Sequence, residues 1–230
     1  MNFEIGSMSR IKIHHYSDIL CIWAYISEIR VQELKSKFSN QIEFDFHFFP
    51  IFGDVPGKMA SSWADRGGLD GYAKHVHATA GQFEHMKVDP GVWVKAQPYS
   101  SLPGHLYIAA VKQLERSDKL PIGSYEQLAS GLRRAFFQNA ADVSNKNVLD
   151  NIVSDAGLPL NEVKAIIETG EAYTTFAEDI QLARDQNVRS SPTLIFNDDR
   201  QRLSGNVGYR IIEANIKELL EHPAMQHSWC

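Results

Sequence analysis

Between residues 58 and 187 the sequence contains several helical runs and almost no strand pattern. Apolar residues recur there with helical spacing, and glycine and proline residues separate one run from the next. The clearest predicted helices cover residues 102–116, 124–138, 146–156, 160–168 and 171–186. Residues 61–98 carry a weaker signal, and the glycine-rich segment 63–72 is expected to be a loop. Because strand patterns lie only on the two sides of this block, we expect an α/β protein with a large all-helical insertion.

The segment before the block predicts a β-α-β unit. Residues 10–16 (RIKIHHY) alternate and are rich in β-formers, and Ser17 and Asp18 supply the turn and capping chemistry that precedes a helix. Residues 21–38 place apolar side chains at a period of about 3.6 and contain neither glycine nor proline, which predicts a helix. Residues 42–49 (IEFDFHFF) alternate again, which predicts a second strand.

The segment after the block predicts a β-β-α unit. Residues 193–197 (TLIFN) are rich in β-formers, and a polar turn connects them to residues 202–204. This pattern is typical of a β-hairpin. Residues 207–220 then form an amphipathic pattern that ends before Pro223, which predicts a closing helix.

Cys21 lies where the first strand gives way to the first helix. Unpaired N–H groups and the helix dipole at that position favour an anion, and such an environment can lower a cysteine pKa from about 8.5 into the range of roughly 3.5 to 7.5. A thiolate is the anion that this position would favour. The alternative is that Cys21 is a small buried apolar residue between Leu20 and Ile22, as most free cysteines are.

A second feature lies 170 residues further on, where Pro192 opens a predicted strand directly after Ser190 and Ser191. Proline is tolerated at the first residue of a strand because it need not donate to the ladder. A cis peptide bond is the less frequent alternative, since about 5–6% of X–Pro bonds are cis.

Taken together, these features resemble the DsbA-like thioredoxin-fold superfamily. The nearest pattern is the FrnE-like oxidoreductase branch with CPWCY at its active site, where this chain has CIWAY at residues 21–25. The YSD at residues 16–18, the RSSPT at residues 189–193 and the GNV at residues 205–207 are similar to that family's lead-in, cis-proline loop and last glycine turn. Kappa-class glutathione transferases and 2-hydroxychromene-2-carboxylate isomerases are related families.

The resemblance implies a thioredoxin-like domain that is interrupted by a helical one. The expected thioredoxin-like part covers residues 8–57 and 188–222, and the inserted helical domain covers residues 58–187. Residues 1–7 are set aside as a candidate leader or tag, and residues 223–230 as a tail.

The resemblance also implies the roles of four residues. Cys21 is expected to be catalytic and to face the Ser191–Pro192 loop, where Ser191 would offer backbone contacts to a peptide or to glutathione. Pro192 would hold that loop, and Trp23 would lie beside the thiol as a substrate contact.

Ala24 stands where the family has a resolving cysteine, so no internal dithiol cycle can close at this motif. Cys21 can still form a mixed disulfide, which an external thiol must resolve. The expected function is therefore a monothiol DsbA-like thiol-disulfide oxidoreductase with no bound cofactor and with glutathione or protein thiols and disulfides as partners. Cys230 is a remote candidate resolver.

Two alternatives remain open. One is a glutathione-dependent transferase or isomerase of the kappa or 2-hydroxychromene-2-carboxylate isomerase type, in which the residue at position 21 activates glutathione. The other is a non-enzymatic thioredoxin-like protein that binds peptides in the same cleft.

Composition excludes other classes of function. A formal net charge of −5 argues against nucleic acid as a partner, and no apolar stretch approaches the roughly 20 residues of a membrane span. The first residues lack a secretion-signal pattern, so we expect a cytoplasmic protein. The oligomeric state is left open, with a homodimer as one alternative.

Other polar residues were weighed as site candidates. The histidine pairs 14/15 and 75/77 have adjacent or near-adjacent spacing that does not converge on one helix face, so no metal site is predicted. Ser100, Ser101 and His105 lie in or next to a polar loop that borders the substrate cleft in related proteins, and they are candidate cleft residues.

Overall fold

The computed structural model describes residues 10–222 and contains one four-stranded sheet with the strand order β2-β1-β3-β4. Strand β1 (Ile11–Ser17) pairs in parallel with β2 (Ile42–Phe48) and antiparallel with β3 (Thr193–Phe196). Strand β4 (Gln201–Ser204) completes the predicted antiparallel hairpin with β3. The α/β thioredoxin-like architecture expected from the sequence is thus confirmed.

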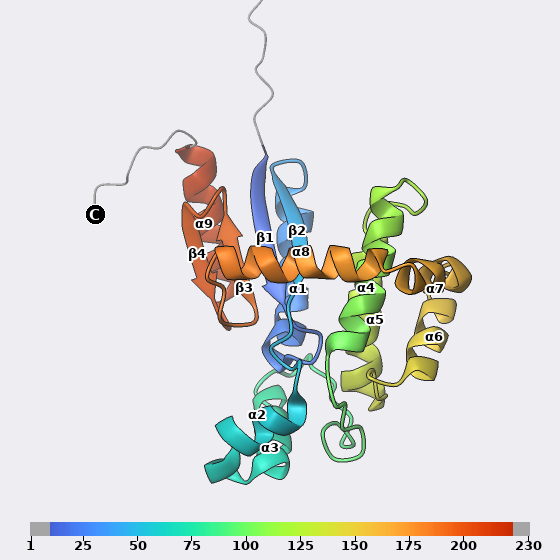
Figure 1. Cartoon of the computed structure of the whole chain (residues 1–230). Helices are drawn as coiled ribbons and strands as arrows, with labels where there is room; N and C mark the ends of the chain where they lie inside the picture. Colours follow the sequence, from blue (N-terminus) through green and yellow to red (C-terminus); the bar gives the residue numbers. More distant parts are fainter. Residues whose placement is uncertain (1–9, 223–230) are drawn as a thin grey trace, which may run out of the picture.

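Helices cover both faces of the sheet. Helix α1 (Ile22–Phe38) and helix α9 (Tyr209–Glu221) bury residues such as Leu34 and Ile216 against one face. Helix α8 (Glu171–Asp185) lies across the other face, as Figure 1 shows, where its Ala183 packs with Tyr16 of β1. This layering explains why β1 carries almost no exposed side chain.

Helices occupy most of the chain between β2 and β3, as the strand-free pattern predicts. They are α2 (Val55–Ser62), a 3₁₀ turn (Ala64–Arg66), α3 (Gly68–Ala80), α4 (Leu102–Arg116), α5 (Ser124–Asn139), α6 (Lys146–Asp155), α7 (Leu160–Glu168) and α8. Figure 1 shows α2 and α3 at one end of the molecule and α4 to α7 beside the sheet. Helix α2 spans residue 57, where the first part of the thioredoxin-like domain is predicted to end. The domain boundaries stay predictions.

The start of this block differs from the structure that the sequence predicts. The glycine-rich segment around residues 63–72 was expected to be a loop, yet it contains the 3₁₀ turn and the first turns of α3. Glycine at positions 67 and 68 adopts positive φ, which lets the chain turn sharply into the helix. The predictions for residues 1–7, for residues 223–230 and for Cys230 concern positions outside the described residues.

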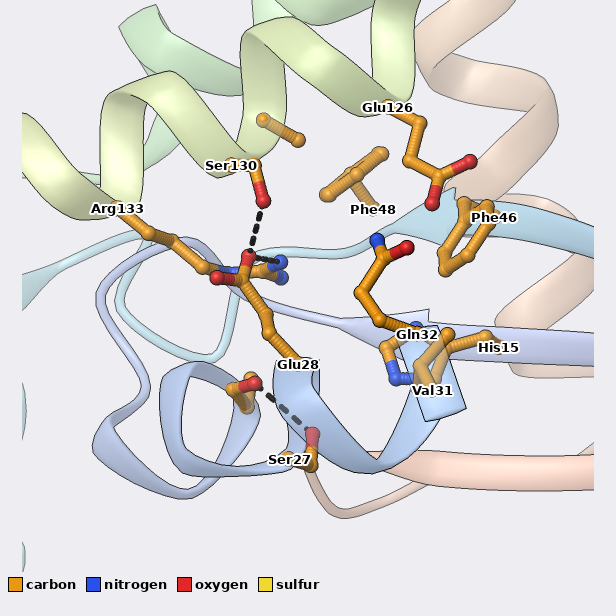
Figure 2. A pocket seen from close by; sticks show the side chains of 12 residues that line it. His15, Ser27, Glu28, Val31, Gln32, Phe46, Phe48, Glu126, Ser130 and Arg133 are labelled. Atoms are coloured by element: carbon orange, nitrogen blue, oxygen red, sulfur yellow. Dashed lines mark hydrogen bonds and ion pairs between the residues drawn. The ribbon is translucent and has the colours of Figure 1, made fainter. Parts of the chain in front are cut away.

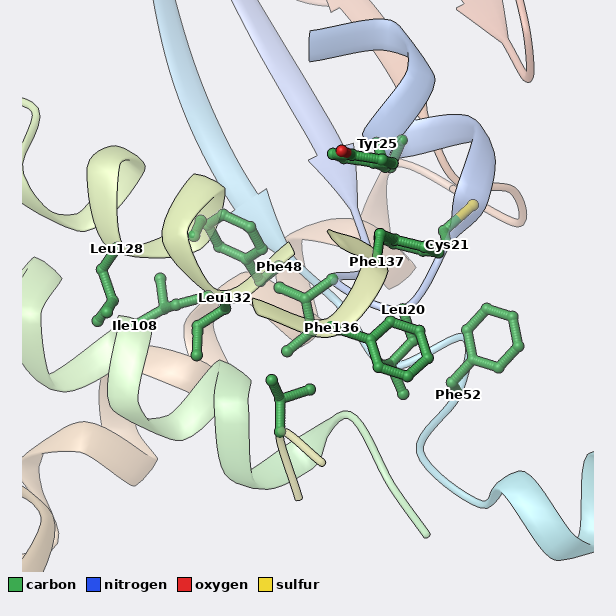
Figure 3. Close-up of a cluster of buried hydrophobic side chains, with 14 of the residues drawn as sticks. Leu20, Cys21, Tyr25, Phe48, Phe52, Ile108, Leu128, Leu132, Phe136 and Phe137 are labelled. Atoms are coloured by element: carbon green, nitrogen blue, oxygen red, sulfur yellow. The ribbon is translucent and has the colours of Figure 1, made fainter. Parts of the chain in front are cut away.

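The largest apolar cluster joins the sheet to the helical block. Figure 3 shows Leu20, Phe48, Phe136 and Phe137 within this cluster and the sulfur of Cys21 at its edge. The ring of Phe137 stacks on Tyr25 of α1, with 4.7 Å between the ring centroids. Side chains from the segment before the insertion and from the insertion itself therefore pack in one cluster with the residue expected to be catalytic.

Candidate functional site

Cys21 is the N-cap residue of α1, so the helix begins one residue later than the range 21–38 predicts. The loop between β1 and α1 is closed by the Cys21 N–H, which donates to the Asp18 carbonyl oxygen at 3.2 Å. The Tyr25 N–H in turn donates to the Cys21 carbonyl oxygen and opens the helix. The cysteine is only 7% exposed, so its sulfur lies at the mouth of the core and not on an open surface.

The Ser191–Pro192 loop faces Cys21, as the resemblance implies. The bond between Ser191 and Pro192 is cis. The Cys21 Sγ–H donates to the Ser191 carbonyl oxygen at 3.2 Å, and the Asp18 N–H donates to Ser191 Oγ at 3.0 Å. Gly205 N–H donates to the Pro192 carbonyl oxygen at 2.7 Å, which ties the loop to the end of β4. Two segments 170 residues apart therefore meet at one sulfur.

The electrostatics of the thiol differ from the expectation based on the helix N-terminus. Burial is the largest influence and raises the pKa of the Cys21 thiol above its ordinary value, and the charge of Asp18 acts in the same direction. The Ser191 side chain and the backbone N–H groups of Ala24 and Trp23 lower that pKa, as predicted for a helix start, but they do not outweigh burial. In this conformation Cys21 is a protonated thiol at neutral pH.

Asp18 organises the site, although the sequence predicts only a turn or capping role for it. Its carboxylate is fully buried and does not cap α1 directly. Oδ1 accepts from the Leu20 N–H at 2.8 Å, and Oδ2 accepts from the Phe52 N–H and the Ser101 hydroxyl, both at 2.8 Å. The carboxylate thus connects the cysteine loop to the segment after β2 and to the start of α4. A buried carboxylate needs such donors. The signal in the sequence was an acidic residue three positions before the cysteine, between two runs of apolar residues.

Ser101 and His105 are not cleft residues, because both side chains are fully buried. The Ser101 hydroxyl donates to Asp18 Oδ2. His105 Nε2 accepts from the Ile19 N–H at 3.2 Å and lies 3.7 Å from Asp18 Oδ1. Ser100 Oγ donates to the Gly53 carbonyl oxygen at 2.7 Å and so holds the loop before α4. Ser101 and His105 thus support the cysteine loop from behind, whereas Ser100 ties the start of α4 to the segment after β2.

Aromatic side chains of α1 and of the insertion belong to the same apolar cluster as Cys21. Trp23 is half-buried, and its ring meets Phe83 edge-on with 6.5 Å between the centroids. Tyr72 of α3 is buried, and burial together with the charges of Cys21 and Asp18 raises its pKa well above the ordinary value. Tyr72 therefore stays a neutral phenol near the sulfur.

A small pocket lies behind the site, between α1, α5 and the sheet. Figure 2 shows Glu28 at its centre, where Oε1 accepts from Ser130 Oγ and from Arg133, both at 2.9 Å. Its water-sized space is ≈ 20 Å³, which suits about one water molecule. Ala24 and His15 line this pocket, so the space beneath position 24 is too small for a substrate.

Residues 12–217 match the model of the DsbA-like thioredoxin domain. The chain belongs to this family. Within the described residues, no helix is both long and apolar enough to cross a membrane. The DsbA-like fold is shared by the cytosolic disulfide reductase DsbM of Pseudomonas aeruginosa, solved with GSH, at a TM-score of 0.61 and 14% identity, covering 94% of this chain and all of that one (100%).

Other proteins that are similar to this chain carry names of different functions. A 2-hydroxychromene-2-carboxylate isomerase aligns with a TM-score of 0.64 and 12% identity over 94% of this chain and 100% of that one. The ClpXP adapter protein SpxH of Shouchella clausii is 21% identical over 232 residues, which cover 95% of this chain and 70% of that protein. The match to SpxH of Bacillus subtilis covers 59% of this chain but less than half (46%) of that protein.

Proposed function

We propose that this DsbA-like protein is a thiol-disulfide oxidoreductase that acts through Cys21 alone. One observation carries the proposal: the Cys21 sulfur faces the Ser191 carbonyl beside Pro192, while the position of the second cysteine is the buried methyl group of Ala24. The thiol thus lies beside the loop, and position 24 has no cysteine that could attack a mixed disulfide on Cys21 and release the substrate.

The proposed cycle has two exchange steps. The deprotonated Cys21 sulfur attacks one sulfur of a substrate disulfide, forms a mixed disulfide and expels the other sulfur as a thiolate, which takes up a proton. Glutathione then attacks the substrate sulfur of the mixed disulfide and regenerates Cys21. In total, one disulfide and one glutathione thiol give one free thiol and one glutathione mixed disulfide, so electrons and protons balance.

The raised thiol pKa bears on the direction of this exchange. Strong dithiol oxidants owe their potential to a stabilised thiolate in the reduced form, which the buried Cys21 does not have. A thiol of higher pKa is intrinsically more nucleophilic once it is deprotonated. We therefore assign the protein a reducing role in the cytoplasm, with glutathione as co-substrate.

The test is incubation of the protein with glutathione disulfide followed by intact mass measurement. We expect one glutathione adduct per chain in the wild type and in Cys230→Ser, and none in Cys21→Ser. Reduced glutathione should then remove the adduct. Absence of an adduct, combined with tight binding of reduced glutathione and turnover in a conjugation or isomerisation assay, would refute the proposal.

Two other functions have specific support. The isomerase-like fold and the missing second cysteine favour a glutathione-dependent transferase or isomerase. The similarity to proteins named as adapters, together with a buried thiol of raised pKa, favours a peptide-binding protein without catalysis. A protein that binds peptides but gives neither adduct nor turnover would support this last function.

A further inference from the structure

Two histidines and an aspartate converge on the face of the sheet that α8 covers, away from the cysteine loop. His14 lies on β1, and Asp45 and His47 lie two residues apart on the neighbouring strand β2. The parallel register places His14 opposite Asp45, and residues two apart on a strand share one face. The convergence therefore follows from strand pairing, which sequence spacing does not reveal.

The donor atoms of these three side chains lie at the corners of a small triangle. His14 Nδ1 is 2.9 Å from His47 Nε2, and Asp45 Oδ2 is 3.6 Å from His14 Nδ1 and 3.4 Å from His47 Nε2. Tetrahedral zinc with nitrogen and oxygen ligands at about 2.0–2.1 Å separates its ligand atoms by about 3.3 Å. Only the distance between the two histidines would have to open, by a few tenths of an ångström.

A second carboxylate orients His47 from behind. Its Nδ1 lies 2.8 Å from Asp179 Oδ1 of α8, and with the proton on Nδ1 the Nε2 lone pair points toward His14 and Asp45. Asp179 is held by Lys112 Nζ at 2.9 Å and by the Phe48 N–H at 3.1 Å. A carboxylate that accepts from the second nitrogen of a ligating histidine is a regular feature of metal sites.

The cluster is accessible enough for an ion to enter. The side chain of Asp45 is 28% exposed and that of His14 is 11% exposed, whereas His47 is 5% exposed. The Lys12 ammonium lies 3.4 Å from Asp45 Oδ2, but its side chain is 52% exposed and can turn into solvent at little cost.

We propose that His14, Asp45 and His47 form a binding site for a divalent transition-metal ion, with zinc as the ion that best fits two imidazoles and one carboxylate. Three protein ligands leave a fourth position for water. The ion would link β1 to β2 directly, and through Asp179 it would link the sheet to α8. The site shares no residue with the proposed thiol chemistry, so the outcome of one test does not decide the other.

The test is titration of the metal-free full-length protein with zinc chloride against a chromophoric chelator. We expect one site per chain, and we expect Asp45→Asn and His14→Gln each to weaken its zinc affinity by on the order of tenfold or more. The matched control is His75→Gln, which removes an exposed histidine of α3 and should leave the affinity unchanged. Circular dichroism establishes that each variant is folded.

Cobalt substitution supplies a second readout that does not depend on the variants. Cobalt bound by two histidines and a carboxylate gives ligand-field bands without the thiolate charge-transfer band that cysteine ligation produces. Zinc binding that survives both Asp45→Asn and His14→Gln, or that is lost in Cys21→Ser with a thiolate band in the cobalt protein, would overturn the proposal. So would the absence of saturable zinc binding, which would leave the cluster as a hydrogen-bonded network alone.

Discussion

The Cys21 thiol donates a hydrogen bond to the backbone carbonyl oxygen of Ser191 at 3.2 Å and so connects the start of α1 to the loop that opens β3. The contact is buried, and the neighbouring Asp18 N–H strengthens it by donating to the Ser191 side chain. For the proposed exchange at Cys21, the thiol must first lose the proton that Ser191 accepts.

The first prediction concerns the pH dependence of Cys21 reactivity. Because burial raises the pKa of the thiol, its protonated form persists beyond neutral pH. In the Cys230→Ser background, the rate of alkylation by iodoacetamide should rise about tenfold per pH unit through neutral pH and level off only above about pH 8.5. Asp18→Asn should shift the profile to lower pH. A plateau below pH 7 would contradict the assignment.

The second prediction restores the absent partner. Position 24 lies one helical turn after Cys21, and its side chain borders a cavity of ≈ 20 Å³, so a sulfur fits there. Ala24→Cys, again with Cys230→Ser, should form an internal disulfide on oxidation and shorten the lifetime of the glutathione adduct. Alkylation followed by mass measurement counts the free thiols. Two thiols that remain free after oxidation would show that the geometry does not support a dithiol site.

The third prediction concerns the contribution to stability of a hydrogen-bond donor to the Asp18 carboxylate. Ser101→Ala removes the hydroxyl donor to Oδ2 and leaves a buried charge with one donor fewer. We expect the free energy of unfolding to fall by about 1–3 kcal/mol, measured by urea denaturation. Ser61→Ala is the matched control, because Ser61 is exposed and bonds only within its own helix. Its effect should stay within about 0.5 kcal/mol.

The fourth prediction is a pH dependence of stability that originates at His105. Burial lowers the pKa of this imidazole below its ordinary 6.5 in the folded protein, so below that pH the unfolded chain binds the proton first. The stabilisation is therefore present above pH 6.5 and is lost as the pH falls below it. For each pH unit below 6.5, the free energy of unfolding falls by up to ~1.4 kcal/mol because of this histidine.

His105→Gln keeps an acceptor for the Ile19 N–H and removes this titration. Urea unfolding between pH 7 and pH 5 should therefore show a shallower pH dependence for His105→Gln than for the wild type. Equal slopes in His105→Gln and the wild type would show that His105 does not titrate on unfolding.

The fifth prediction compares two helical glycines. A Cβ atom added at Gly71 would lie 1.8 Å from the backbone oxygen of Arg66, which cannot move aside, whereas at Gly131 the nearest atom is 3.9 Å away. Gly71→Ala should therefore cost at least about 1–3 kcal/mol. Gly131→Ala should stabilise the protein by roughly 0.4–1 kcal/mol. Thermal melts of both variants check the opposite signs, and a stable Gly71→Ala would contradict the close approach at α3.

The order of the elements could be predicted because the local spacing of apolar residues indicates each strand and helix. Alternation predicted β1 and β2, helical spacing predicted α4 and α7 to the residue, and the absence of strand patterns predicted the insertion. The glycine-rich start of α3 was missed because glycine has low helix propensity, and packing of Tyr72 and Val76 against the core outweighs that propensity.

The sequence by itself thus determined the fold, the place of Cys21 at a helix start and the absence of a resolving cysteine at position 24. Only the tertiary structure decided the direction of the Cys21 pKa shift, the burial of Ser101 and His105, and the meeting of His14 with His47. The physical reason is that burial and long-range partners set these properties, and both depend on segments far apart in the chain. Local patterns record backbone preferences, and they do not record which distant charges and donors will surround a side chain.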